Sequence, residues 1–241
     1  SDPRALEPSV VGSKTASIVD LVRNGVTVPP GFSIHASAFN EFTRPVATKI
    51  TKILESVTVD DASSSFDASD SINELLVSLN LPDGLAIQAA ERIDSNAGTS
   101  AVRSSATVED LEGASFAGMY DSFLDAADAE SVLRRVRDVW ASYYTGRAIS
   151  YRRRMGIPHG SGSMAVLVME LVNADAGGVV FTRDPRDGTD QILVNAALGL
   201  AEGVVSGAAE ADSFTLHSDS FEVIRRDVID KEWMFVAGKS G

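Results

Sequence analysis

The residues best suited to chemistry lie in one stretch, AVRSSATVEDLEGASFAGMYDSFL, which runs from Ala101 to Leu124. Arg103 follows a short β-prone run and precedes two hydroxyls, Ser104 and Ser105. A loop of small residues follows at 113–118. Arginine presents a planar fork of donors that suits phosphate oxygens, and small residues let a backbone approach a ligand with its N–H groups free. The stretch predicts a phosphate cradle between two strands.

A second cation, Lys14, lies at the expected start of a helix. Ser13 can cap this helix, apolar residues between 18 and 22 share one face, and Asn24-Gly25 is a stop signal. Unpaired N–H groups at a helix start attract anions, so Lys14 is a second candidate phosphate ligand. A proline pair then leads into a short strand at 32–34.

Both cations have an alternative role that needs no ligand. Arg103 could pair with Glu109 or Asp110 while the glycines form an ordinary turn, because glycine-rich loops are weak signals alone. Lys14 could be an ordinary solvated lysine. Spacing by itself leaves these alternatives open.

The rest of the pattern predicts two lobes. Helices are expected at 37–56, 71–79, 83–93 and 128–155, with a surface loop at 60–70. Six basic residues of the longest helix are interpreted as a solvated face that offsets carboxylates: Arg134, Arg135, Arg137, Arg152, Arg153 and Arg154. Strands are expected at 164–168, 178–182, 191–196, 213–216 and 221–226, the first two joined by a hairpin-like turn. A helix-rich first part and an antiparallel second part predict an α+β fold.

Composition restricts the class of function. Hydrophobic residues make up 44% of the 241 residues, enough for a sizeable core. The net charge of −13 argues against nucleic acid and anionic membranes as partners, and no apolar run reaches the length of a membrane span. The absence of cysteine excludes disulfides and thiolate metal sites, and it fits a cytoplasmic protein.

The motif around Arg103 resembles the VRSSAT-EDL-ASFAG motif of the phosphoenolpyruvate synthase (pyruvate, water dikinase) and rifampicin phosphotransferase group. This group shares an ATP-binding domain with pyruvate, phosphate dikinase. Further segments are similar to the family's VGGKGASL, MAVVVQ-MV, AGVLFT-DP and GLGE-VVSG stretches. The resemblance spans about Val11 to Met234, and Gly12-Ser13-Lys14-Thr15 replaces the family's Gly-Gly-Lys-Gly.

The resemblance implies an ATP-grasp fold whose two lobes clamp ATP. Lys14 and Arg103 would hold the transferring oxygens as catalytic residues, and Mg²⁺ would bridge the phosphates. The implied nucleotide-binding positions are Ser104, Gly118, Ser122, Met169, Glu170, Val172, Thr182 and Glu202. Related enzymes transfer the β-phosphoryl group of ATP to a histidine on a swivelling domain, and from there to pyruvate or another acceptor.

The resemblance also implies parts that this sequence does not contain. We expect a tail at 1–10, the helix-rich part of the first lobe at 11–100, the cradle hairpin and long helix at 101–160, and an antiparallel second lobe at 161–241. The family's last metal-binding strands, the phosphohistidine domain and the acceptor domain would lie elsewhere, on the same or another chain. No metal ligand is predicted within these residues. The alternative function is a non-catalytic nucleotide-binding or regulatory module that keeps the fold.

Overall fold

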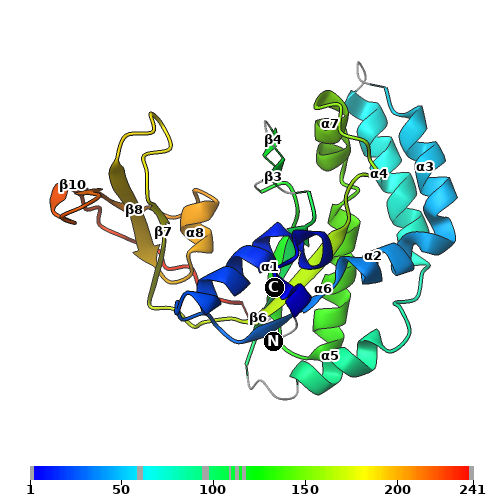
Figure 1. Ribbon diagram of the computed structural model, residues 1–241, viewed down its shortest axis with the longest axis horizontal. Helices are drawn as coiled ribbons and strands as arrows, with labels where there is room; N and C mark the ends of the chain where they lie inside the picture. The colour runs from blue at the N-terminus through cyan, green and yellow to red at the C-terminus, as the bar shows by residue number, and fades with distance from the viewer. Residues whose placement is uncertain are drawn as a thin grey trace. The chain divides into compact units, whose positions relative to one another are not determined.

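The computed structural model describes residues 3–58, 62–93, 98–108, 110–111, 114–115 and 118–238. The chain forms two compact units, one ending at Leu171 and the other beginning at Val172 (Figure 1). Each unit contains a four-stranded antiparallel sheet, with helices mainly in the first unit. This arrangement confirms the predicted α+β class.

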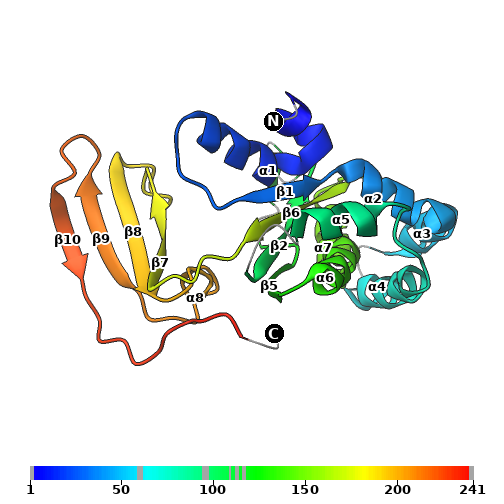
Figure 2. The same ribbon diagram turned by 90° about the horizontal axis from the view of Figure 1, so that it is seen from below.

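The sheet of the first unit has the strand order β1-β6-β2-β5. These strands are Gly31–Ile34, Met164–Glu170, Ser100–Ala106 and Ser122–Ala126. Helix α1 (Pro8–Arg23) packs against β2 and β6 on one face, and α6 (Ala129–Ser142) packs on the other (Figure 2). The sequence pattern predicts the residues of β6 in the second lobe, whereas in the structure β6 is a central strand of the first unit.

The remaining elements of the first unit are mostly short helices. They are η1 (Pro3–Leu6), α2 (Ala36–Thr43), η2 (Arg44–Val46), α3 (Ala47–Ser56), α4 (Ala62–Val77), α5 (Leu85–Ile93), α7 (Gly146–Arg154) and the strand pair β3 (Asp110–Leu111) and β4 (Ala114–Ser115). Within the described parts of the chain, no helix is both long enough and apolar enough to cross a membrane.

An aromatic cluster forms the centre of the first unit's core. Trp140 is fully buried, and its ring centroid lies 4.9 Å from that of Phe42 and 6.2 Å from that of Phe39. The indole Nε1 of Trp140 donates a hydrogen bond of 3.1 Å to the carbonyl of Met164 on β6. The indole therefore joins α6 to the sheet through both packing and a satisfied polar group.

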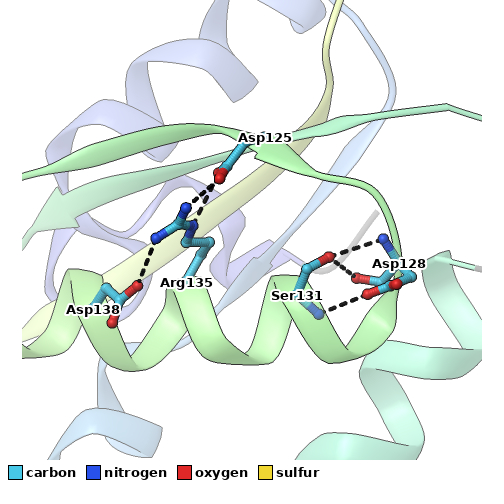
Figure 3. A network of polar contacts seen from close by, with 5 residues as sticks. All are labelled: Asp125, Asp128, Ser131, Arg135 and Asp138. Carbon is cyan, nitrogen blue, oxygen red and sulfur yellow. Dashed lines mark hydrogen bonds and ion pairs between the residues drawn. The ribbon is translucent and has the colours of Figure 1, made fainter. Parts of the chain in front are cut away.

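Polar contacts fix the start of α6 and its attachment to β5 (Figure 3). Asp128 is the N-cap, and its carboxylate accepts from the amide of Ser131 at 2.7 Å while the Ser131 hydroxyl bonds the Asp128 backbone in return. Arg135 donates to Asp125 of β5 and to Asp138 one turn on. The Arg135 hydrogen bond lowers the pKa of Asp125. For Arg135, the expected role of offsetting carboxylates is confirmed.

One helix prediction and one loop prediction were wrong for identifiable reasons. The expected helix 128–155 is divided between α6 and α7, because the hydroxyl of Thr145 accepts from the amide of Ala148 and starts a new helix. The expected loop 60–70 lies largely within α4. Its buried face includes Ser65, Ala68 and Ser69, small residues whose composition suggested a loop but which allow close helix packing.

Arg152 corrects the interpretation of the basic cluster as a solvated face. Its side chain is fully buried, and its guanidinium donates to the carbonyl of Tyr143 at 2.7 Å, the hydroxyl of Tyr120 at 3.3 Å and Nδ1 of His159 at 3.2 Å. It also lies 4.3 Å from the Tyr143 ring centroid. A charge surrounded by fitted acceptors can be buried, which the local sequence does not reveal.

The second unit has the strand order β10-β9-β8-β7. The strands are β7 (Ala176–Phe181), β8 (Gln191–Leu198), β9 (Asp212–His217) and β10 (Val223–Asp227), and α8 (Glu202–Val205) contacts β7 and β8. The predicted hairpin of the last two strands is confirmed. The predicted hairpin between β6 and β7 is wrong, because these strands belong to different sheets.

Candidate functional site

The position of Lys14 depends on a break in helix α1. Gly12 has φ 77° and ψ 161°, which are not helical angles, and the helix resumes after it. A Cβ atom at Gly12 would lie 1.9 Å from the carbonyl oxygen of Ser105 on β2. Only glycine combines this backbone conformation with such a close approach. Ser13 and Thr15 are helical, so replacing the family's neighbouring glycines leaves this turn intact.

Ser105 connects the break in α1 to β2. Its buried hydroxyl donates to the carbonyl of Val11 at 2.8 Å and accepts from the amide of Thr15 at 3.0 Å. It also bonds the Thr15 hydroxyl at 3.1 Å. The part of α1 that follows Gly12 is thus capped by the side chain of Ser105, which lies 90 residues from Thr15 in the sequence.

Lys14 reaches β2 at the residue that follows Arg103. The Nζ of Lys14 donates to the backbone carbonyl of Ser104 at 2.8 Å. Side chains alternate along a strand, and Ser105 faces α1 whereas Val102 belongs to the core on the α6 side. Arg103 therefore lies on the α1 face with Ser105, beside the carbonyl that Lys14 contacts. Arg103 is also the one position of β2 that is not buried.

The three other predicted cradle positions differ in accessibility. Ser122 on β5 is the cross-strand neighbour of Arg103 and is exposed. Gly118 is exposed, has φ +67° and leaves open space where a side chain would be. The Ser104 hydroxyl belongs to a side chain that is 1% exposed, so at this residue the carbonyl, not the hydroxyl, meets Lys14. Of the remaining loop, residues 109, 112, 113, 116 and 117 lie outside the described residues.

The predicted adenine-reading positions lie at the end of β6. Met169 is 8% exposed and faces Gly31 on β1, where a Cβ atom would lie 3.0 Å from its Cγ. The amide of Glu170 donates to the Pro30 carbonyl at 2.9 Å, and the amide of Leu171 donates to the Thr99 carbonyl at 2.8 Å. These two amides are therefore already bonded within the first unit.

Val172, Thr182 and Glu202 belong to the second unit, and all three are exposed. Thr182 follows β7, and Glu202 begins α8. Next to Thr182, buried Asp184 accepts from the amide and Nε of Arg186, both at 2.9 Å, and these hydrogen bonds lower the pKa of Asp184 to about 2. The turn that carries Thr182 is thus held by a charged hydrogen-bond network.

The glycine spacing of 199–207 has a packing explanation that sequence reasoning missed. Gly199 has φ +81°, and a Cβ atom there would lie 1.9 Å from the carbonyl of Phe235. A Cβ atom at Gly203 would meet the Phe235 ring at 2.5 Å. These two glycines therefore accommodate a later segment of the same chain.

The structure brings Lys14, Arg103 and Ser122 to one region of the first unit, with Gly12 and Ser105 as unpredicted supports. Ser105 was visible in the motif beside Ser104, and strand alternation could have shown which of the two hydroxyls faces Arg103's side of the sheet. Among the described residues, no group of three or more His, Cys, Asp or Glu side chains could hold a metal ion.

Comparison with known sequences assigns the family. The sequence profile described as "Pyruvate phosphate dikinase, AMP/ATP-binding domain" matches residues 8–241. The chain belongs to this family. The match covers Lys14, Arg103 and every other predicted site residue, and it confirms the resemblance found in the motifs.

Several curated relatives of this dikinase family are similar to the chain. It is 36% identical over 242 residues to the "Probable phosphoenolpyruvate synthase" of Methanocaldococcus jannaschii, covering 96% of this chain and 20% of that protein. It is 30% identical over 269 residues to the "Phosphoenolpyruvate synthase" of Pyrococcus furiosus, covering 94% and 33%. The corresponding protein of Aeropyrum pernix is 34% identical over 234 residues, covering 92% and 28%. The chain thus spans a fifth to a third of the length of these relatives.

Proposed function

We propose that this chain is the ATP-binding part of a dikinase-type phosphotransferase with an ATP-grasp fold. ATP phosphates bind at the α1 face of β2, where Lys14 and Arg103 neutralise their charge. The observation that carries the proposal is the contact of Lys14 Nζ with the Ser104 carbonyl, directly beside Arg103. Two cations from positions 89 residues apart in the sequence reach one strand of an acidic chain, and such a local positive site suits a polyanion.

The surrounding residues complete the proposed nucleotide site. Ser122, the cross-strand neighbour of Arg103, and Gly118 line the phosphate cradle, and Met169 packs near the adenine through its thioether. On sequence similarity alone, Val172, Thr182 and Glu202 remain proposed nucleotide-binding residues. Mg²⁺ binds together with the nucleotide, since this ion retains phosphate and water oxygens and needs few protein ligands.

The reaction that fits this site is transfer of the β-phosphoryl group of ATP to a histidine on another domain, with release of AMP and with water taking up the γ-phosphoryl group as inorganic phosphate. Catalysis consists of positioning and charge neutralisation, because phosphoryl transfer asks little covalent chemistry of the protein. The histidine domain and an acceptor domain, for pyruvate or a similar molecule, are the proposed partners. A cysteine-free chain that uses ATP fits the cytoplasm, which is the proposed location.

Isothermal titration with ATP–Mg²⁺ tests nucleotide binding. Lys14→Ala and Arg103→Ala should each weaken affinity by about tenfold or more, since a hydrogen bond to a charged group contributes roughly 1.5–3 kcal/mol. The matched controls are Lys52→Ala and Arg134→Ala, which remove exposed cations from α3 and α6. Unchanged affinity in both site variants would contradict the proposal.

The alternative function is nucleotide binding without transfer. Met169 favours it, because it stands where the family often has glutamine and an amide side chain able to read adenine is lost. An experiment that mixes the chain with a phosphohistidine domain and with ATP labelled at the β-phosphate distinguishes the two functions. Label on the histidine supports the phosphotransferase, whereas tight ATP binding with no labelled histidine supports the binding module.

A further inference from the structure

We propose that Ser105 is a positioning residue that holds Lys14 in place for the ATP phosphates. The proposal rests on the proposed function and adds a residue to the same site. It assigns no contact between Ser105 and the nucleotide, because the Ser105 side chain is fully buried.

Ser105 occupies the place of a missing helical hydrogen bond. In an uninterrupted helix the amide of Thr15 would donate to the carbonyl of Val11, four residues earlier. Here the Ser105 hydroxyl lies between them, accepting from the Thr15 amide at 3.0 Å and donating to the Val11 carbonyl at 2.8 Å. Insertion of a side chain into the backbone ladder is a recognised cause of helix kinks. The break at Gly12 therefore has a specific cause on β2.

The hydroxyl of Ser105 is fully used, and this fixes its orientation. A serine hydroxyl has one donor and two acceptor positions. The donor is taken by Val11, and the two acceptor positions by the amide and the hydroxyl of Thr15. Without the hydroxyl, a buried amide and a buried carbonyl at the break would lose their partner, which favours closing or shifting the turn.

The turn fixed in this way carries Lys14. Lys14 precedes Thr15 in the helix, and its Nζ contacts the carbonyl of Ser104, the residue before Ser105. The same two-residue piece of β2 thus anchors the backbone of the turn through Ser105 and receives the lysine side chain through Ser104. Arg103 directly precedes Ser104 on the same strand. A shift of the turn would therefore move Lys14 relative to Arg103.

Nucleotide titrations on four versions of the chain test this role: the unchanged chain, Ser105→Ala, Lys14→Ala and the double variant. Ser105→Ala should weaken ATP binding by about tenfold and leave adenosine binding within about twofold, because the phosphates lose a positioned cation. In the Lys14→Ala background, Ser105→Ala should change ATP affinity by less than about twofold, because residues that act as a unit are not additive. Thr15→Val, which keeps the amide bond and removes one of the three contacts, should give a smaller loss of the same kind.

The matched control is Ser163→Ala, another buried serine with two hydrogen-bond partners, the Ala36 carbonyl at 3.0 Å and the Asn40 side chain at 2.9 Å. It should leave the ratio of ATP to adenosine affinity unchanged. The positioning role would be overturned if Ser105→Ala weakened ATP binding and adenosine binding equally. It would also be overturned if Ser105→Ala caused its full loss of ATP affinity in the Lys14→Ala background. If Ser105→Ala does not fold, the ratio of ATP affinity to adenosine affinity is measured in Thr15→Val instead. An unchanged ATP affinity in Lys14→Ala would also overturn the positioning role, and an unchanged affinity in both Lys14→Ala and Arg103→Ala would overturn the proposed function.

Discussion

The two four-stranded sheets of this chain have opposite environments. In the first unit, β2 and β6 are buried at all but one position each, and α1 and α6 pack on opposite faces of the sheet. In the second unit, every residue of β10 is exposed and β9 has no fully buried residue. Exposed apolar side chains there include Val180, Phe221, Ile224 and Trp233.

The difference shows how to interpret an exposed polar residue in each of the two sheets. In a strand that is otherwise buried, one partly open arginine requires an explanation, and Arg103 of β2 is such a residue. In the second unit exposure is common, so the exposure of Thr182 or Glu202 indicates nothing by itself. The same contrast predicts that the first unit contains most of the folding free energy of the chain.

The largest expected effect distinguishes the two tryptophans. Trp140→Ala should lower the free energy of unfolding by about 3–5 kcal/mol, because it leaves a cavity among aromatic rings and removes the hydrogen bond to Met164. Trp233→Ala, at a side chain 74% exposed in the second unit, should change it by less than about 0.5 kcal/mol. Urea denaturation followed by circular dichroism measures both. Similar losses at the two sites would remove the proposed contrast.

The second prediction compares two glycines with nearly equal positive φ angles. Gly12→Ala should destabilise the chain by about 1–3 kcal/mol more than Gly188→Ala, because its Cβ atom would overlap the Ser105 carbonyl whereas Gly188 has open space around it. Gly188→Ala measures the cost of a positive φ angle without a steric overlap, in the second unit. Thermal unfolding of the two variants measures the difference. Equal melting temperatures would mean that α1 can move away from β2.

The third prediction concerns acid sensitivity of the first unit. Burial, followed by the charges of Arg152 and Arg153, lowers the pKa of His159 to about 4. Between about pH 6.5 and pH 4 the unfolded chain therefore binds a proton that folded His159 does not, so stability should fall as pH falls through this range. His159→Asn, which keeps an acceptor for Arg152, should flatten this part of the curve. Urea titrations at a series of pH values, followed by Trp140 fluorescence in a Trp233→Phe background, test it.

The smallest expected effect is local to the second unit. The pKa of Asp184 is lowered to about 2 by the Arg186 hydrogen bonds, so its stabilising contribution is present above about pH 4 and is lost as pH falls toward about 2. Hydrogen exchange of the Gly188 amide, which bonds the Asp184 carbonyl at 2.8 Å, reports on this turn. Asp184→Asn should give fast exchange already at neutral pH. Exchange independent of pH and of this substitution would show that the turn does not depend on the carboxylate.

Sequence patterns were most informative where structure is set by neighbours along the chain. The hairpin of β9 and β10, the strand around Arg103 and the stop of α1 near Asn24 follow from alternation and turn residues. The long helix at 128–155 and the loop at 60–70 were wrong, because a cap at Thr145 and close helix packing at Ser65 override composition. Burial of Arg152 was missed because its acceptors lie between 7 and 32 residues away in the sequence.

The sequence by itself determined the α+β class, the dikinase family and the two cations expected at the phosphates. Only the tertiary structure decided that Lys14 reaches the strand of Arg103, that Gly12 must be glycine and that Ser105 interrupts the helix. These features depend on hydrogen bonds and close contacts between α1 and β2, residues about 90 positions apart. Local sequence patterns encode periodicity and turns, whereas such contacts exist only after the sheet and the helix have packed together.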